Sequence, residues 1–420
     1  MEYLIKRNKI EEIRNHLNKK EITLISGARQ TGKTTIMKKL QKELMAKGKN
    51  TLFLNLDFEM DKEYFTSQSQ LIQKLQLEFG SNNAYIFVDE IQRKENAGLF
   101  LKGIYDMELP YKFIISGSGS IELKEKIHES LFGRKQQFEL KPVTFSEFLN
   151  YKTNYRYENK LVDFCRVESN KRELILKEYL NFGGYPRVVT STEKSEKKMI
   201  IAEIVSSYIN MDISFLLNLT KTDEYLNMIK LLAGQAGKVI NYSKLSKNAG
   251  VSLPTLKKYI WYAEKTFCIH RITPFFKNIS KEIRKSPIFY FNDLGFSNYI
   301  INKFGSLSEP EDFAFIFQNF IYTIIAEKLN NTSSTIHFWR TTDKTEVDFV
   351  INTGDNYIPI EIKYSHLKTP SVKRSMRSFI DKYNPQKALI INLNLTHKIQ
   401  LRGTELNFLP YWDFINYQIN

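Results

Sequence analysis

The chain has 420 residues, which is too long for one compact core and predicts about two to four domains. Hydrophobic residues make up 42% of it, but no window reaches the roughly 18 consecutive apolar residues of a membrane span. The net charge of +15 favours a polyanionic partner such as nucleic acid, although a lysine-rich protein without such a partner would carry the same charge. Two distant cysteines, scattered histidines and a charged N-terminus argue against a disulfide framework or structural zinc and indicate a cytoplasmic protein.

The motif GARQTGKT at residues 27–34 is the strongest signal in the chain. It follows an apolar run at 22–25 and precedes a helical pattern at 34–44, as a P-loop does. The glycines let backbone N–H groups turn toward phosphate oxygens, Lys33 reaches the β and γ phosphates, and the Thr34 hydroxyl holds Mg²⁺. A glycine loop without nucleotide is the alternative. The residues expected to bind ATP are Gly27, Ala28, Arg29, Gln30, Thr31, Gly32, Lys33, Thr34 and Thr35.

A P-loop requires a second element, an apolar strand that ends in an acid near Mg²⁺. The segment AYIFVDEIQ supplies it, because Asp89 follows the apolar residues 85–88. Glu90 comes next and can orient and deprotonate the attacking water, which predicts ATP hydrolysis rather than nucleotide storage. A strand that merely ends in charged residues is the alternative.

Three more strands are predicted around these motifs, in NTLFLNLDFE, KFIISGSGS and QQFELKP. The second of them brings Ser116 or Ser118 to the carboxyl edge of a parallel sheet, where ligands bind in open α/β folds. Either hydroxyl could position the water near the γ-phosphate, or the segment is an ordinary turn rich in Ser and Gly. The pattern is typical of ATPases that carry a catalytic glutamate.

Together, the segments GARQTGKTT, IFVDEIQ, IISGSGS, LFGRKQQFELKPVTFSEFL and YLNFGGYPRVV resemble bacterial and archaeal AAA-type ATPases with a C-terminal domain of unknown function. The resemblance extends over nearly the whole chain and implies an AAA-type core at residues 1–150 with ATP as its ligand. Arg134, in LFGRK, matches an arginine typical of the family. Its expected partner is a γ-phosphate, either in the same chain or in a neighbouring subunit of a homo-oligomer. A structural ion pair with a carboxylate is the alternative.

Residues 151–220 have apolar and charged residues at helical spacing and are predicted to form a helical lid. The sequence GGYPR at 183–187 interrupts them as a turn. Arg187 could reach back from this turn to the nucleotide, but a Gly-Gly-x-Pro turn needs no such role.

Residues 221–310 are predicted to form a winged-helix domain. NYSKLSKNAGVSLPTLKKYIWYAEK has two helices, capped by Ser243 and Ser252, with a turn at Gly250 between them. Residues 221–275 hold nine Lys or Arg and three Asp or Glu, so this segment has a net charge of +6. Lys257 and Lys258 on the second helix are the expected DNA contacts. A module that only packs against the ATPase core is the alternative.

Residues 311–420 follow the order of a PD-(D/E)xK nuclease-like domain, with the long helix EDFAFIFQNFIYTIIAEKL before the strands IHFWRT, EVDFVI, YIPIEIKY and ALIINLNL. A four-residue loop would place Asp348 opposite Glu361, with Lys363 on the same face. The two carboxylates would bind Mg²⁺, and Lys363 would orient water or offset phosphate charge. The EVDF and PIEIKYS pattern also occurs in the resembled family, but a solvated polar face would alternate in the same way. The opposite, apolar face is predicted to hold Val347, Phe349, Ile351, Ile358, Ile360 and Ile362.

One residue departs from the family pattern, because Gln318 stands where the long helix usually carries a glutamate. Glutamine brings no negative charge to a metal, and Glu327 lies nine residues further on, half a rotation away. The sequence therefore predicts a Mg²⁺-dependent ATPase whose nucleotide state controls a DNA-binding, nuclease-like C-terminal half. The alternative is a nucleotide-dependent switch or scaffold with an inactive nuclease-like domain that binds protein.

Overall fold

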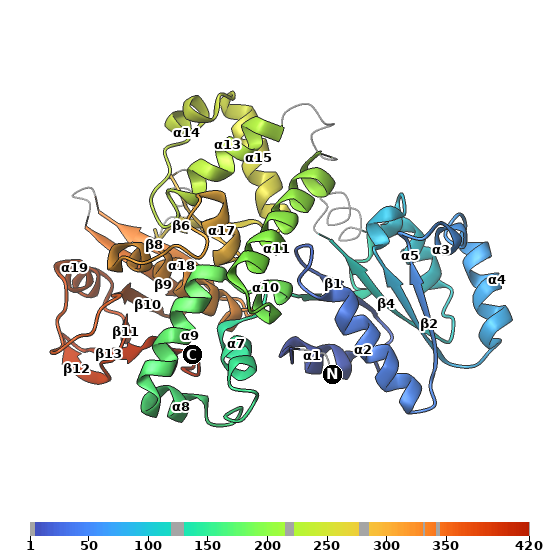
Figure 1. Ribbon diagram of the computed structural model, residues 1–420, viewed down its shortest axis with the longest axis horizontal. Coiled ribbons are helices and arrows are strands. Elements are labelled where there is room, and N and C mark those ends of the chain that lie inside the picture. The colour runs from blue at the N-terminus through green and yellow to red at the C-terminus, as the bar shows by residue number, and fades with distance from the viewer. Residues whose placement is uncertain are drawn as a thin grey trace.

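The computed structural model describes residues 5–118, 130–214, 222–276, 285–330, 332–341 and 345–419 (Figure 1). Its N-terminal part is a five-stranded sheet in the order β2-β3-β4-β1-β5, and every neighbouring pair is parallel. All five predicted strands are present. Strand β4 lies between β1, which leads into the P-loop, and β3, which ends in Asp89. The strands are β1 (Ile22–Ser26), β2 (Asn50–Asn55), β3 (Ala84–Asp89), β4 (Tyr111–Gly117) and β5 (Lys135–Glu139).

Helices cover both faces of this sheet because its strands are apolar on both sides. One face packs against α1 (Lys9–His16) and α2 (Lys33–Ala46), through side chains such as Ile13 and Met37. The other packs against α4 (Gln68–Phe79) and α5 (Ala97–Asp106), through Leu71 and Leu101. A short helix α3 (Glu59–Glu63) and a 3₁₀ turn η1 (Ile91–Arg93) follow β2 and β3. The result is a three-layer α/β core built on the parallel sheet that the sequence predicted.

The helices after this core pack mainly on the C-terminal half rather than on the N-terminal sheet. Apolar residues of α7, α8 and α9 share one hydrophobic cluster with the C-terminal sheet, while α10, α11 and α17 join a second cluster with α13, α14 and α15. The helices are α7 (Phe145–Lys152), α8 (Leu161–Val167), α9 (Ser169–Phe182), α10 (Pro186–Thr190), α11 (Lys194–Ser207), η2 (Tyr208–Ile213), α13 (Thr222–Ala233), α14 (Tyr242–Ala249), α15 (Leu253–Lys265) and α17 (Leu294–Ile300).

A second sheet runs through the whole C-terminal half, in the order β12-β13-β11-β10-β9-β8-β6-β7. The hairpin β6–β7 that follows α15 joins this sheet because β6 pairs in parallel with β8. The predicted domain boundary at residue 310 therefore falls between β7 and β8, two strands of the same sheet. The strands are β6 (Ile269–Pro274), β7 (Ile288–Phe291), β8 (Thr335–Arg340), β9 (Glu346–Asn352), β10 (Tyr357–Ile362), β11 (Lys387–Asn392), β12 (His397–Leu401) and β13 (Thr404–Pro410).

Helix α18 (Pro310–Lys328) covers one face of this sheet, α19 (Arg374–Tyr383) covers the other, and α20 (Tyr411–Phe414) ends the fold. The predicted hairpin register is confirmed, because Asn352 pairs with Tyr357 and Phe349 with Ile360. The predicted apolar face is wrong for Val347. A β-bulge opposite β8 shifts the alternation, so Val347 packs with the α19 cluster while Phe349 packs with the α18 cluster.

Candidate nucleotide site and C-terminal carboxylate site

The predicted P-loop joins the end of β1 to the start of α2, at the carboxyl edge of the parallel sheet. Gly27 is packed so closely that a Cβ there would lie 2.3 Å from the Leu140 carbonyl oxygen. The Lys33 ammonium is buried and donates to the carbonyl oxygens of Gly27 at 3.1 Å and Ala28 at 2.8 Å. Burial lowers the pKa of Lys33. The Lys33 side chain thus lies inside the P-loop, where it is predicted to contact the phosphates of ATP.

The end of β3 brings an acid to this loop, as the sequence predicted. The Thr34 hydroxyl donates to Asp89 Oδ2 at 2.7 Å, and the Ser116 hydroxyl at the end of β4 donates to the other oxygen of Asp89. A hydroxyl beside a carboxylate is an oxygen ligand set that suits Mg²⁺, so the residues present fit the predicted ion.

Glu90 lies directly beyond Asp89 and has a left-handed backbone conformation, with φ at 56°. Its N–H donates to Ser116 Oγ at 3.3 Å, and the Gln92 amide donates to its carboxylate and, at 3.0 Å, to Ser118 Oγ. Burial raises the pKa of Glu90, while Lys33 opposes the rise. A strained backbone and a carboxylate with a raised pKa are both typical of functional sites, and a raised pKa suits a general base. Gln92 is a member of this group that the sequence reasoning missed, although it follows Glu90 by two residues.

A buried arginine near the N-terminus hydrogen-bonds to the backbone of the P-loop. Arg7 donates to the Thr31 carbonyl oxygen at 2.8 Å and to Glu147 Oε2 at 3.0 Å. Glu147 also completes the capping box of α7 with Thr144. No motif marked Arg7, because its partners lie far apart in the sequence.

Two side chains from the C-terminal half reach the same loop. Arg187, at the start of α10, donates to Gln30 Oε1 at 3.3 Å and to Glu203 Oε1 at 2.8 Å. It therefore contacts the P-loop, which is the direction in which the sequence allowed it to reach. Asp212 in η2 accepts a hydrogen bond from Arg29 Nε at 3.0 Å. Nothing in the sequence singled out Asp212, which is one acid in a long helical stretch.

Arg134 lies at the amino end of β5, at the opposite edge of the sheet from the P-loop. Its guanidinium binds the Asp106 carboxylate, with Nε 2.7 Å from Oδ1. In this conformation Arg134 therefore cannot contact the γ-phosphate of an ATP bound to its own chain. Its contact with Asp106 is the structural ion pair that the sequence offered as the alternative. A contact with a neighbouring subunit stays a prediction.

Helices α14 and α15 form the predicted helix-turn-helix, with Gly250 in a left-handed conformation between them and Ser252 capping α15. The predicted first cap is wrong by two residues. Asn241, rather than Ser243, accepts a hydrogen bond from the Lys244 N–H at 2.9 Å. Lys257 and Lys258 are exposed on α15.

In the C-terminal half, Asp348 lies between α18 and β10. Gln318 Nε2 donates to its Oδ1 at 3.1 Å, and the Ile362 N–H donates to its Oδ2 at 2.7 Å. Burial raises the pKa of Asp348 to about 7, and the nearby Glu361 carboxylate adds to the rise. The hydrogen bond from the Ile362 N–H acts in the opposite direction and lowers the pKa. Asp348 is half-buried and hydrogen-bonded to both donors, so it is not a freely solvated side chain.

Glu361 is 1% exposed, and its Oε1 lies 3.0 Å from Lys373 Nζ at the start of α19. Lys363 Nζ is 4.0 Å from the same oxygen and donates to the Ser371 carbonyl oxygen at 2.7 Å. Two carboxylates at one site suit a divalent cation. Within the described ranges, however, no three His, Cys, Asp or Glu side chains gather as a metal site. Lys373 is a member of this site that the sequence analysis missed.

The strand order, the P-loop and the paired acids resemble those of AAA-like P-loop domains. Comparison with protein families agrees, because residues 19–149 match an AAA domain. Residues 173–307 and 313–414 match two domains of unknown function, DUF8612 and DUF4143. The chain thus matches an AAA domain followed by these two domains.

Its relatives are uncharacterized bacterial and archaeal proteins. One from Haemophilus influenzae is 22% identical, over 93% of this chain and 94% of that protein. Another from Methanocaldococcus jannaschii is 23% identical, over 93% of this chain and 87% of that protein.

Two solved structures are similar in part. Cdc6p from Pyrobaculum aerophilum is 9% identical with a TM-score of 0.29, over 72% of this chain and 96% of that one. AMPPCP-bound DnaA from Aquifex aeolicus is 16% identical with a TM-score of 0.25, over 61% and 87%. These scores are too low to support an argument. No helix in the described part of the chain is long and apolar enough to cross a membrane.

Proposed function

We propose that the chain is a Mg²⁺-dependent ATPase whose nucleotide state controls nucleic-acid binding by its C-terminal half. The observation that carries the ATPase proposal is the hydroxyl–carboxylate group of Thr34, Asp89 and Ser116, with Glu90 beside it. An AAA domain at residues 19–149 supports the same reading.

Each side chain has a distinct role in this proposal. Lys33 leaves the loop carbonyls to bind the β and γ phosphates, and Thr34 and Asp89 hold Mg²⁺, which neutralises phosphate charge when bound. Glu90 accepts the proton of the attacking water. Ser116 keeps Asp89 and the Glu90 backbone aligned, because its hydroxyl hydrogen-bonds to both.

Nucleic-acid binding is proposed for the helix-turn-helix of α14 and α15 and the β6–β7 hairpin, a winged-helix arrangement. Lys257 and Lys258 are exposed on α15, in a segment with a net charge of +6 over residues 221–275. Such a surface attracts phosphates without reading bases, and duplex DNA is the expected partner.

The alternative for the nuclease-like domain is a scaffold without cleavage activity that binds protein. The observation that favours it is the set of donors around the two acids, since an amide N–H, a backbone N–H and an ammonium group face Asp348 and Glu361. The backbone N–H and the ammonium group cannot be metal ligands, and Gln318 faces Asp348 with its amide nitrogen rather than with the oxygen that can ligate a metal. The restored-acid variant described in the Discussion tests this point.

The experiment that tests the proposed function is ATP turnover by the full chain, with and without duplex DNA, at two salt concentrations. We expect Mg²⁺-dependent turnover, and an effect of DNA that weakens at the higher salt concentration because counterions compete for the phosphates. Turnover without any DNA effect would leave an ATPase but refute its link to nucleic acid. Absence of turnover and of ATP binding would refute the ATPase itself.

A further inference from the structure

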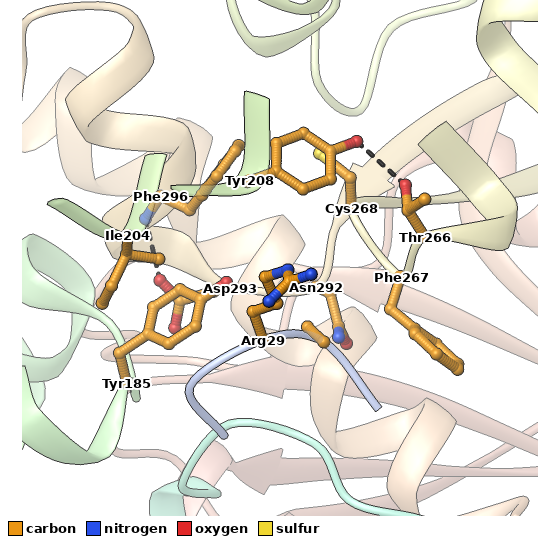
Figure 2. A pocket seen from close by; sticks show the side chains of 11 residues that line it. Arg29, Tyr185, Ile204, Tyr208, Thr266, Phe267, Cys268, Asn292, Asp293 and Phe296 are labelled. Atoms are coloured by element: carbon orange, nitrogen blue, oxygen red, sulfur yellow. Dashed lines mark hydrogen bonds between the residues drawn. The ribbon is translucent and has the colours of Figure 1, made fainter. Parts of the chain in front are cut away.

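The Arg29 side chain leaves the P-loop and enters a small cavity built by the C-terminal half (Figure 2). Tyr208, Thr266 and Asn292 line this cavity from η2, the end of α15 and the end of β7. Arg29 Nε donates to Asp212 Oδ1 at 3.0 Å, and the Asp212 side chain is 4% exposed. A P-loop cation is thus bound by an acid that lies 183 residues away in sequence.

Asp212 lies within the electrostatic reach of the phosphate site. Burial raises its pKa, while Arg29, Lys33 and Arg93 lower it. Arg29 likewise opposes the rise in the pKa of Glu90. Arg29 and Asp212 are therefore near the end of the loop where Lys33 would contact the β and γ phosphates. Phosphate oxygens there would attract Arg29 and repel Asp212.

The segment that carries Asp212 is a π-helix, η2, which continues α11. Single π-helical turns are rare and occur frequently at functional sites. From the same turn, the Tyr208 hydroxyl bonds with the Tyr225 hydroxyl of α13 at 2.5 Å and the Thr266 hydroxyl at 2.9 Å. Thr266 is the C-terminal cap of α15, the helix that bears Lys257 and Lys258. One helical turn thus contacts both the P-loop and the proposed DNA-binding helix.

We propose that Asp212 is a nucleotide sensor. When ATP binds, its phosphates attract Arg29 away from Asp212, and η2 is displaced. The hydrogen bonds of Tyr208 transmit this displacement to α15. The sensor rests on the proposed function and deepens it, since it names the contact by which nucleotide state reaches the helix-turn-helix. Asp212 acts through Arg29 and is a positioning residue rather than a catalytic one.

The test is nucleotide binding by the full chain with Mg²⁺, using ATPγS and ADP in calorimetry. Asp212→Asn keeps the shape and one acceptor but removes the charge that holds Arg29 and repels phosphate. We expect roughly tenfold tighter binding of ATPγS and a smaller gain for ADP, which lacks the γ-phosphate. In an Arg29→Gln background the gain from Asp212→Asn should be smaller, because no guanidinium is then released and only the repulsion between Asp212 and phosphate is removed. Asp381→Asn, which breaks an exposed pair with Arg402, is the matched control and should bind as the parent does.

Tyr208→Phe tests transmission separately, because it removes a hydroxyl and leaves the ring. ATPγS affinity should stay at the parent value, while the nucleotide-dependent change in affinity for labelled duplex DNA should shrink. If the parent binds nucleotide and folded Asp212→Asn binds ATPγS no more tightly, the sensor is refuted and the ATPase proposal stands. If the parent binds no nucleotide, both fail. If Asp212→Asn does not fold, Arg29→Gln decides alone, since an unchanged nucleotide effect on DNA binding in that variant refutes the sensor.

Discussion

The two acidic sites of this chain differ in the groups that surround their carboxylates. In the nucleotide site, Asp89 is held by the hydroxyls of Thr34 and Ser116. In the C-terminal site, Asp348 is held by N–H groups and Glu361 faces the Lys373 ammonium. A hydroxyl can rotate and become a ligand, whereas a backbone N–H or an ammonium has no lone pair to offer, and the Gln318 amide must flip before its oxygen faces the acid. Paired acids in a sequence therefore do not by themselves predict a metal site, because the neighbouring donors decide what the acids can bind.

The largest expected effect tests the nucleotide side of this comparison. Lys33→Ala should weaken ATP binding roughly 100-fold, because a charge-assisted contact to phosphate is lost. Glu90→Gln should bind ATP but turn it over about 10²–10⁴ times more slowly, because the water loses its base. Calorimetry and phosphate release measure the two effects. Lys38→Ala, an exposed lysine on the same helix, is the control. Equal ATP affinity in Lys33→Ala and the parent would contradict the prediction.

A second prediction concerns the basic surface of α15. Replacing Lys257 and Lys258 with alanine should lower DNA affinity about tenfold and alike across sequences. The slope of log affinity against log salt should fall by roughly 2, since two phosphate contacts are lost. Gel retardation at several salt concentrations measures both. Replacing the exposed Lys47 and Lys49 of the N-terminal core should leave the slope unchanged. A flat salt response in the parent would refute the surface altogether.

Restoring the missing acid would sharpen the comparison directly. Gln318→Glu replaces an amide donor to Asp348 with a third carboxylate, so Mn²⁺ should bind about tenfold more tightly. Any cleavage of DNA should require Mg²⁺ or Mn²⁺ and disappear in Asp348→Ala and Lys363→Ala. Gln76→Glu adds the same charge on the exposed face of α4 and should change neither result. If calorimetry detects no divalent binding in the parent or in Gln318→Glu, the nuclease resemblance is one of fold alone.

The raised pKa of Asp348 predicts a smaller effect, on stability. An acid whose folded-state pKa is about 7 stabilises the fold fully below its unfolded value near 4, and this stabilisation is lost as pH rises through 7. The shift corresponds to at most about 4 kcal/mol, and partial solvent access reduces the loss to roughly 1–3 kcal/mol. Asp348→Asn should remove this pH dependence in urea unfolding between pH 4 and pH 8. An unchanged pH dependence in that variant would contradict the assignment.

The smallest expected effect is at Arg134. Its ion pair with Asp106 lies at the surface, where water screens the charges, so Arg134→Ala should change the free energy of unfolding very little. Turnover in dilute solution should not change, since the arginine lies at the far edge of the sheet from the P-loop. A loss of turnover that appears only at concentrations where copies associate would instead support a contact with a neighbouring subunit.

The nucleotide site was predictable because its motif residues act through backbone geometry and fixed spacing. Gly27 and Asp89 lie at the ends of β1 and β3, whose apolar runs the sequence marks clearly, and Lys33 and Thr34 begin α2. The hairpin register was predictable for a similar reason, because loop length fixes which residues face each other.

What the sequence did not predict depends on contacts between distant elements. The bulge that moves Val347 arises from pairing with β8, which the local alternation of β9 cannot reveal. Asp212 acquires its partner from Arg29, 183 residues away, and Lys373 meets Glu361 only because the segment between β10 and α19 folds back. The cap at Asn241 was missed because Ser243, two residues later, has a similar capping preference.

The eight-stranded sheet determines where this chain can be divided. Because β6 pairs with β8, a cut between β7 and α18 would expose two unpaired strand edges. Helices α7 to α9 pack on the same half, so a shorter fragment that keeps its core should begin near residue 144. Even there, the buried pair between Arg7 and Glu147 crosses the cut. Protease digestion should therefore release an N-terminal fragment and leave the C-terminal half in one piece.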